Sequence, residues 1–160
     1  PTLPPLCTRV PSPMITSPSV IQAIREHGAD AYPEEGCGFL LGAVDESGTN
    51  RISRVRRVAN RKTENRERRY EITPDDYRAA AEEAAGDGLD VVGFYHSHPD
   101  HPAEPSETDL AEATFPGYTY VIVSVDDGTP ADLTAWSLAP DRSRFRPEEV
   151  RLFEATASGQ

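Results

Sequence analysis

The residues with the clearest chemistry in this chain are two histidines one residue apart, His96 and His98, followed by Asp109. Successive side chains of a β-strand point to opposite faces, so imidazoles at positions i and i+2 project to the same side and can reach one ion at roughly 2.0–2.1 Å. Two histidines and one carboxylate leave a fourth tetrahedral position for water, as in catalytic zinc sites. The spacing therefore predicts a hydrolytic zinc site with His96, His98 and Asp109 as ligands.

Residues 90–95 supply the strand that this geometry requires. They are mostly β-branched or aromatic, and Pro99 removes a backbone donor and so ends the run. A His-X-His pair is also compatible with two polar residues at the end of a strand. Ser106 and Asp109 also fit a helix N-terminus, with Ser106 as the cap and acidic residues in the first turn. The two interpretations agree, because the first turn of a helix can face a metal held by the preceding strand.

An acidic residue upstream extends these histidines into a longer pattern. The segment Glu35-Gly36-Cys37-Gly38 precedes an apolar run, and His96-Ser97-His98-Pro99 is followed by Ser106 after six residues and by Asp109 after two more. This pattern resembles the active-site motif of the JAMM (MPN-plus) zinc metallopeptidases. The order of the elements is similar to that family over most of the chain.

The resemblance implies roles for individual residues. The two histidines and Asp109 are expected to bind one zinc ion per chain, with Glu35 as the general base and Ser106 as a stabiliser of the oxyanion. Glu34 lies next to Glu35 in the sequence. We choose Glu35 because it stands three residues before Gly38, as the glutamate of the family does.

The length of the chain predicts a single folded unit. At 160 residues and 17.5 kDa it is large enough to bury roughly 70% of the surface of its unfolded form. We expect a metallopeptidase domain at 14–155, between a proline-rich flexible leader at 1–13 and a flexible tail at 156–160. No apolar run approaches the roughly 18–20 residues that span a bilayer, and no basic segment followed by an apolar stretch marks a secretory signal. A cytoplasmic location without membrane association is therefore expected.

The two cysteines, Cys7 and Cys37, are too few to cross-link a domain of this size. We expect both to be reduced. Cys37 begins an apolar run, so it is expected to be a small buried residue of the core rather than a nucleophile.

The periodicity of apolar residues predicts an α/β fold with a mixed β-sheet sandwiched by helices. This agrees with the MPN/JAMM-like (cytidine-deaminase-like) architecture that the resemblance implies. The strand at 37–44 is continuously apolar and is expected to be buried on both faces. The expected helices cover 18–28, 74–85 and 106–114, and the other expected strands cover 51–59, 90–96, 118–125 and 132–138, with a weaker last strand within 143–152.

Basic residues gather in the segment 51–69, which has a net charge of +7 while the rest of the chain has −18. One interpretation is a solvated edge strand whose charges prevent pairing with another sheet. The other is a docking surface for an acidic partner protein. Nucleic acid is not expected as a partner, because the rest of the surface is strongly negative.

The resemblance implies hydrolysis of an amide or isopeptide bond. Short prokaryotic members of the family resemble proteases that cut after the C-terminal Gly-Gly of ubiquitin-like sulfur carriers, so a carrier of this kind is the expected partner. Two alternatives stay open, namely a catalytically inactive MPN-type scaffold, and a zinc hydrolase acting on another amide or in DNA repair. A nucleoside deaminase is not supported, because the chain contains neither of the metal motifs His-X-Glu and Pro-Cys-X-X-Cys.

Overall fold

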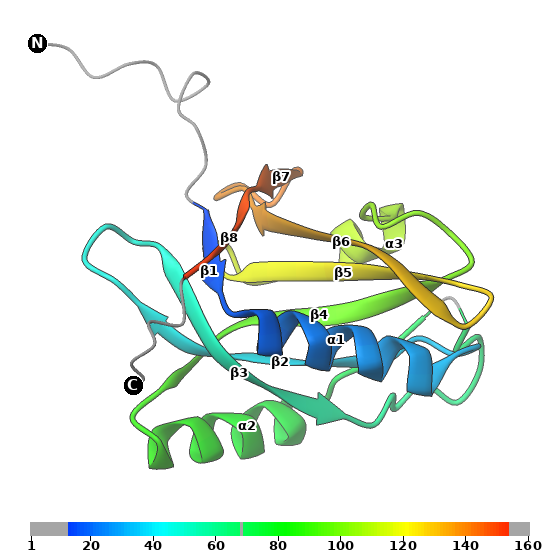
Figure 1. Ribbon diagram of the computed structural model, residues 1–160, viewed down its shortest axis with the longest axis horizontal. Coiled ribbons are helices and arrows are strands. Elements are labelled where there is room, and N and C mark those ends of the chain that lie inside the picture. The colour runs from blue at the N-terminus through cyan, green and yellow to red at the C-terminus, as the bar shows by residue number, and fades with distance from the viewer. Residues whose placement is uncertain (1–12, 68, 154–160) are drawn as a thin grey trace, which may run out of the picture.

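The computed structural model describes residues 13–67 and 69–153, which form one eight-stranded mixed sheet with three helices (Figure 1). The strand order is β7-β6-β5-β4-β2-β3-β1-β8. The elements are β1 (Met14–Thr16), α1 (Pro18–Ala31), β2 (Cys37–Val44), β3 (Asn50–Val58), α2 (Pro74–Gly86), β4 (Asp90–Pro99), α3 (Glu107–Glu112), β5 (Thr119–Asp126), β6 (Thr129–Leu138), β7 (Phe145–Glu148) and β8 (Val150–Leu152). The predicted leader, apart from Pro13, and the predicted tail lie outside the described residues.

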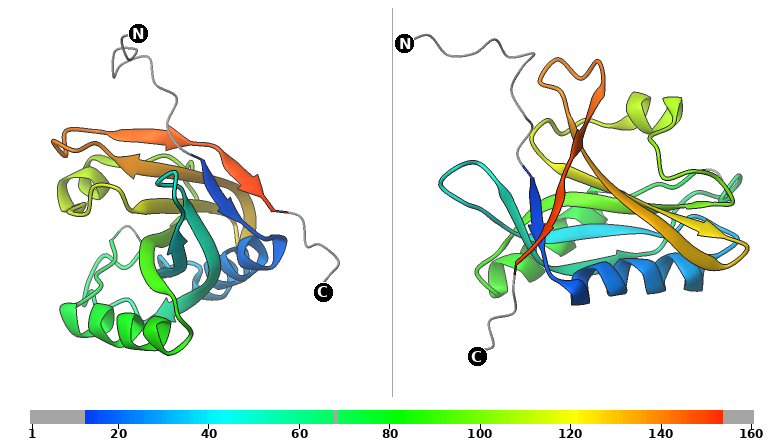
Figure 2. Two further views of the ribbon diagram at one scale, coloured as in Figure 1. Left: turned by 90° about the vertical axis from the view of Figure 1, so that its left-hand side faces the viewer. Right: turned by 45° about the horizontal axis from the view of Figure 1, so that its top comes forward.

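Helices cover both faces of this sheet, as expected from the sequence. One core contains Val20 and Ile24 of α1 packed against Leu40 of β2 and Val121 of β5. A second core, on the other face, contains Ala80 and Ala84 of α2, with α3 packed at its border. Figure 2 shows the sheet twisted, with α1 on one side and α2 and α3 on the other. Within the described residues, no helix has the length and apolar character needed to cross a membrane.

The predicted helix at 18–28 continues to Ala31, so Gly28 does not end it. A Cβ atom at Gly28 would lie 3.0 Å from Val125 Cγ2 and 3.3 Å from Ser97 Cβ. Glycine is therefore needed here for close packing of the helix on the sheet, rather than for termination. The extra turn carries the chain to the segment that contains Glu35.

The predicted strand at 90–96 is also too short, because β4 continues to Pro99. Its neighbour β5 runs parallel to it and pairs through the last residue, with Pro99 opposite Val125. This ladder keeps His96 and His98 on one rigid strand. On its other side β4 pairs with the antiparallel strand β2, whose residues Cys37 to Gly42 are buried. β4 therefore lies in the centre of the sheet.

Two strand assignments and the length of one helix also differ from the sequence prediction. The predicted last strand at 143–152 is two strands on opposite edges, β7 and β8, and β1 was not predicted. Strands of three or four residues show too few alternations to be recognised from the pattern. The predicted helix at 106–114 is also shorter, since Ala113 has an extended backbone and terminates α3.

Cys37 is a buried residue of β2 with no exposed surface, as predicted. Burial raises the pKa of its thiol to about 12, and the nearby charge of Glu35 acts in the same direction. The thiol is therefore protonated at neutral pH and lacks the reactivity of a nucleophilic cysteine.

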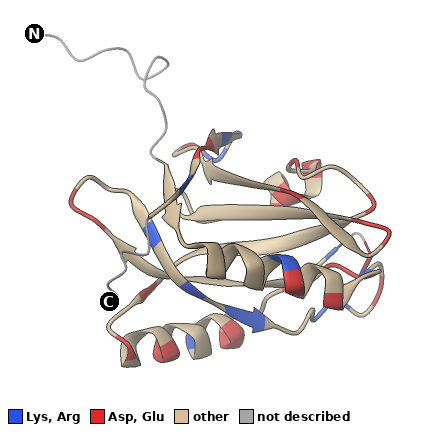
Figure 3. Ribbon diagram, in the orientation of Figure 1, with Lys and Arg blue, Asp and Glu red and all other residues tan. Residues whose placement is uncertain are grey.

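The arginines of β3 lie between the two helical layers rather than on an isolated edge. β1 lies beside β3, with Ile15 opposite Arg51. Arg54 and Arg56 form ion pairs with Glu83 of α2. Figure 3 shows basic residues along β3 and acidic residues on α2 below it. At these positions the charge concentration contributes to the attachment of a helix to the sheet.

The same pairing continues at the end of β3 and in the loop after it. Arg57 contacts Asp30 of α1 at 3.0 Å, and Arg61 contacts Asp76 of α2 at 2.8 Å. These arginine side chains remain about half exposed. Arg68, which belongs to the basic segment, lies outside the described residues.

Candidate metal centre

The two histidines and Asp109 meet at the end of β4. His96 Nε2 and His98 Nε2 are 3.1 Å apart. Asp109 Oδ2, from the first turn of α3, lies 3.3 Å from His96 Nε2 and 3.1 Å from His98 Nε2. Both imidazoles are almost completely buried, with 3% of His96 and 1% of His98 exposed. The three atoms form a nearly equilateral triangle.

This triangle has the dimensions of a zinc site. Ligand atoms at roughly 2.0–2.1 Å from a tetrahedral ion are separated from one another by about 3.3–3.4 Å. The three observed separations, 3.1 to 3.3 Å, come within a few tenths of an ångström of that value. Two neutral imidazoles and one carboxylate are also ligand types that zinc prefers. The residues present therefore fit a zinc ion with three protein ligands.

Contacts behind the histidines direct their ligand atoms. His98 Nδ1 donates a hydrogen bond to the carbonyl oxygen of Pro102 at 2.7 Å, which leaves the lone pair on Nε2. The ring of Tyr70 stacks on His96, with centroids 4.6 Å apart and 24° between the planes. Burial lowers the pKa of His96, and the carboxylate of Asp109 only partly opposes this shift. Both contacts favour neutral, oriented imidazoles.

Asp109 is held by the helix N-terminus that the sequence predicted. The backbone N–H of Ser106 donates to Asp109 Oδ2 at 2.9 Å, and the backbone N–H of Asp109 donates to Ser106 Oγ at 3.0 Å. This reciprocal pair is a capping box. Although burial acts to raise it, the close ring nitrogens of His96 and His98, together with the backbone N–H of Ser106, hold the pKa of Asp109 well below its usual range. The carboxylate is therefore ionised, as a metal ligand must be.

Ser106 is exposed at the cap of α3. Its hydroxyl oxygen accepts a hydrogen bond from the backbone N–H of Asp109, and this bond caps the helix. A hydroxyl that accepts one bond can still donate its own proton. The structure thus places Ser106 next to a predicted ligand, and its role toward an oxyanion stays a prediction.

Glu35 lies beside the triangle, and Glu34 does not. Only 3% of Glu35 is exposed, and its Oε1 is buried without a hydrogen-bond partner among residues 13–67 and 69–153. Burial, followed by the charge of Asp109, raises the pKa of Glu35 to about 9, and Arg69 acts in the opposite direction. Glu34 is partly exposed and has Arg66 Nη1 3.7 Å from its carboxylate. Of the two acids, only Glu35 belongs to a group of possible ligands that includes His98, and its role as a base stays a prediction.

The middle residue of the His-Ser-His segment attaches the Glu35 loop to β4. Ser97 Oγ accepts a hydrogen bond from the backbone N–H of Gly36 at 2.8 Å. The backbone N–H of Ser97 donates to the carbonyl of Gly36 at 3.0 Å. Its side chain points to the face opposite the histidines, as the alternation of a strand requires. The sequence analysis did not identify this residue.

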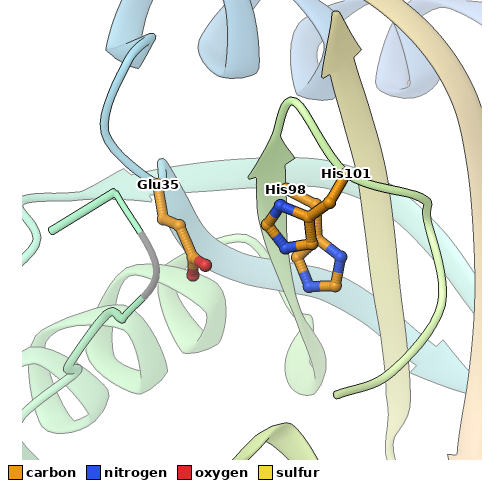
Figure 4. Close-up of side chains that lie close together, drawn as sticks. All are labelled: Glu35, His98 and His101. Carbon is orange, nitrogen blue, oxygen red and sulfur yellow. The ribbon is translucent and has the colours of Figure 1, made fainter. Parts of the chain in front are cut away.

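His101 was also missed, although it is the third histidine within six residues. Its ring stacks on His98, with centroids 4.1 Å apart and 20° between the planes. Glu35, His98 and His101 each offer a possible ligand atom within 4.8 Å of the others. Figure 4 shows the carboxylate of Glu35 pointing toward these two rings. The local density of histidines was the only signal for it in the sequence.

A groove of about 520 Å³ opens next to Asp109. It lies between the segment that leads into α2 and the end of α3. Its walls are largely aromatic, from Tyr70, Tyr77, Phe94, Phe115 and Tyr120. An extended peptide of small residues could follow these walls to the metal centre.

Comparisons with known proteins identify the family. The family model described as prokaryotic homologs of the JAB domain (Prok-JAB) matches residues 17–139. Desampylase of Haloferax volcanii is 38% identical over 108 residues, covering 68% of this chain and 75% of the relative. CysO-cysteine peptidase of Mycobacterium tuberculosis is 30% identical over 144 residues, covering 86% and 90%. The solution structure of a Salinibacter ruber protein is 63% identical with a TM-score of 0.73, covering 89% and 94%. This chain belongs to the Prok-JAB family, and it is a hydrolase of the JAMM type.

Proposed function

We propose that this protein is a zinc-dependent peptidase that hydrolyses the amide or isopeptide bond after the C-terminal Gly-Gly of a ubiquitin-like sulfur-carrier protein. The observation that carries the proposal is the buried triangle of His96, His98 and Asp109, with the carboxyl group of Glu35 beside it. Such a triangle leaves one tetrahedral position for a ligand from solvent or substrate. The relatives named desampylase and CysO-cysteine peptidase support a protein carrier as the substrate.

In the proposed mechanism, the chain moves protons and orients the substrate. Zinc bound by the three ligands supplies Lewis acidity and lowers the pKa of water in the site. Glu35 accepts the proton of the attacking water and later donates it to the leaving amine. Burial raises the pKa of Glu35, which favours holding a proton between the two transfers. The positive charge of a bound zinc ion would lower that pKa again and so favour the carboxylate that accepts the proton. The hydroxyl of Ser106 donates to the developing oxyanion.

The groove beside Asp109 supports an extended tail as the part of the substrate that enters. Glycine has no side chain, so a Gly-Gly segment can approach Asp109 and Tyr70 closely where a larger residue would meet the aromatic walls. The aromatic side chains farther along the groove would contact the residues that precede Gly-Gly. The folded body of the carrier would then remain outside.

The test uses a carrier protein extended by one residue beyond Gly-Gly and a peptide of the same last eight residues. Mass spectrometry would measure the release of the added residue by zinc-loaded protein, and a chelator should abolish that release. Glu35→Gln should retain one zinc equivalent and lose about 100-fold to 10,000-fold in turnover, the usual contribution of a general base. Glu34→Gln is the matched control and should leave turnover unchanged.

Two outcomes would contradict the proposal. Full zinc occupancy with no cleavage of either substrate would favour a scaffold or a hydrolase for another amide. Equal losses in Glu35→Gln and Glu34→Gln would show that the proton is transferred by a different group.

A further inference from the structure

A second group of possible metal ligands lies against the first and shares one histidine with it. It consists of Glu35, His98 and His101, whose ligand atoms lie within 4.8 Å of one another (Figure 4). His101 follows β4 by two residues, and its ring is folded back onto His98. The proposed function uses Glu35 and His98 but assigns nothing to His101.

The geometry of His101 gives it a ligand atom. Its Nδ1 lies 2.8 Å from the carbonyl oxygen of Pro99, and only an N–H can donate to a carbonyl. The lone pair of the neutral ring is therefore on Nε2. Metal-bound histidines usually donate their second nitrogen to a carbonyl or a carboxylate in this way.

Glu35 supplies a carboxyl group beside this nitrogen, which would lose its proton on binding a cation. Its Oε1 is buried and makes no hydrogen bond to any residue that the structure describes, so this oxygen lacks there the partner that a buried polar atom requires. Asp109 and Glu112 are near enough to act on Glu35 electrostatically, and Arg69 opposes them. One imidazole and one carboxylate beside two further acids form a favourable position for a divalent cation.

We propose that Glu35 and His101 bind a second, exchangeable zinc ion, and that this ion inhibits the hydrolase. The inference rests on the proposed function, in which the first ion occupies His96, His98 and Asp109. When that ion is bound, the Nε2 lone pair of His98 is occupied, so the second ion has two protein ligands instead of three. A second ion held by Glu35 removes the group that accepts the proton of the attacking water.

The two sites must differ in affinity. Two divalent cations at adjacent positions repel each other, and repulsion within a buried site is screened less than at the surface. The second site also has fewer protein ligands. Zinc should therefore fill the first site at low free concentration and the second only at higher concentration, so that excess zinc switches the enzyme off.

The experiment counts zinc and measures turnover on the same samples. The folded protein is dialysed against buffers of increasing free zinc, and its zinc content is measured by elemental analysis. The parent protein should bind a first equivalent at low free zinc and a second at higher free zinc. Its turnover of the extended carrier should rise with the first equivalent and fall with the second.

His101→Phe is the matched variant, because phenylalanine keeps the ring that stacks on His98 and removes both nitrogens. It should bind the first equivalent only, and its turnover should not fall when free zinc is raised. His101→Asp replaces the imidazole with another zinc ligand and should restore the second equivalent. Circular dichroism of each variant verifies that the fold is retained.

Several results would overturn the inference. If the parent binds no second equivalent, the site does not exist. If the parent and His101→Phe bind the second equivalent equally, the extra zinc is adventitious. Binding of the second equivalent without loss of turnover would refute the inhibitory role. Failure of the proposed function is separate, since it would appear as a missing first equivalent or as no cleavage at one equivalent.

Discussion

The stability of this fold should fall steeply in mild acid because of one buried histidine, His27. It lies on α1 and is 9% exposed. Its Nδ1 lies 2.6 Å from the hydroxyl oxygen of Tyr95. Burial, and then the charge of Arg57, lower the pKa of His27 from 6.5 to about 4, while Asp30 acts in the opposite direction. At pH 7 the imidazole is neutral and shares a hydrogen bond with the tyrosine hydroxyl.

The sign of the effect follows from the two pKa values. Between pH 6.5 and pH 4 the unfolded chain binds a proton at His27 and the folded chain does not, so the free energy of unfolding decreases as the pH falls. The contribution is fully present above pH 6.5. With pKa values of 6.5 and about 4, the loss is about 2 kcal/mol at pH 5 and about 3 kcal/mol at pH 4. Losses of this size are a large fraction of the stability of a typical domain.

The assay is urea unfolding of the parent and of His27→Gln at pH 7, 6, 5 and 4. The glutamine amide can donate to or accept from the hydroxyl of Tyr95 but does not titrate, so the difference between the two proteins isolates the titration of His27. The parent should lose about 2 kcal/mol more than the variant between pH 7 and pH 5. Parallel pH profiles for the two proteins would refute the reasoning. The zinc content of both at pH 7 serves as a control for the Glu35 loop, because a Cβ at Gly36 would lie 3.3 Å from His27 Nε2.

Three further changes test the metal centre and the basic segment. Asp109→Ala should reduce the zinc content measured by elemental analysis, because it removes one of three protein ligands; unchanged occupancy would exclude it as a ligand. Ser106→Ala should lower turnover by about 100-fold to 1000-fold if its hydroxyl stabilises the oxyanion, whereas loss of a cap alone costs about 1 kcal/mol. Thr73→Ala removes the equivalent capping box of α2, and its unfolding midpoint calibrates that structural cost. If the basic segment docks the carrier, changing Arg56 and Arg57 to glutamate should lower cleavage of the carrier but not of the peptide. Loss of their exposed ion pairs should lower the free energy of unfolding by only about 1 kcal/mol or less per pair. If mutant and parent cleave both the carrier and the peptide with equal efficiency, these arginines do not dock the carrier and serve only in contacts with the helices.

Local signals were sufficient to predict the central elements. The strand at 37–44 has the predicted bounds, and the helix beginning at Pro74 follows a threonine cap with acids in its first turn. The juxtaposition of His96 and His98 depends only on the alternation of a strand, which is a property of sequence spacing. Asp109 could be placed because a capping box fixes the start of a helix within one residue.

The surroundings of the centre depend on contacts that no local pattern contains. Asp100 has a φ of 59°, which turns the chain back after β4 and brings His101 over His98. Aspartate adopts this left-handed conformation more readily than most residues, but the sequence does not show that it does so here. The turn is held from a distance, since the hydroxyl of Tyr32 donates to Asp100 Oδ2 and the backbone N–H of Asp127 donates to Oδ1.

The proposed metal ligands and the proposed base are attached to different parts of the fold. His96 and His98 belong to β4, which is paired on both sides, so the triangle of ligands is anchored in the most rigid part of the sheet. Glu35 and His101 instead lie on loops. Ser97 joins the first loop to β4, and the bond from Tyr32 to Asp100 joins the two loops to each other. A displacement of these loops would move the base and the second candidate ligand together while the three ligands of the first ion stayed in place.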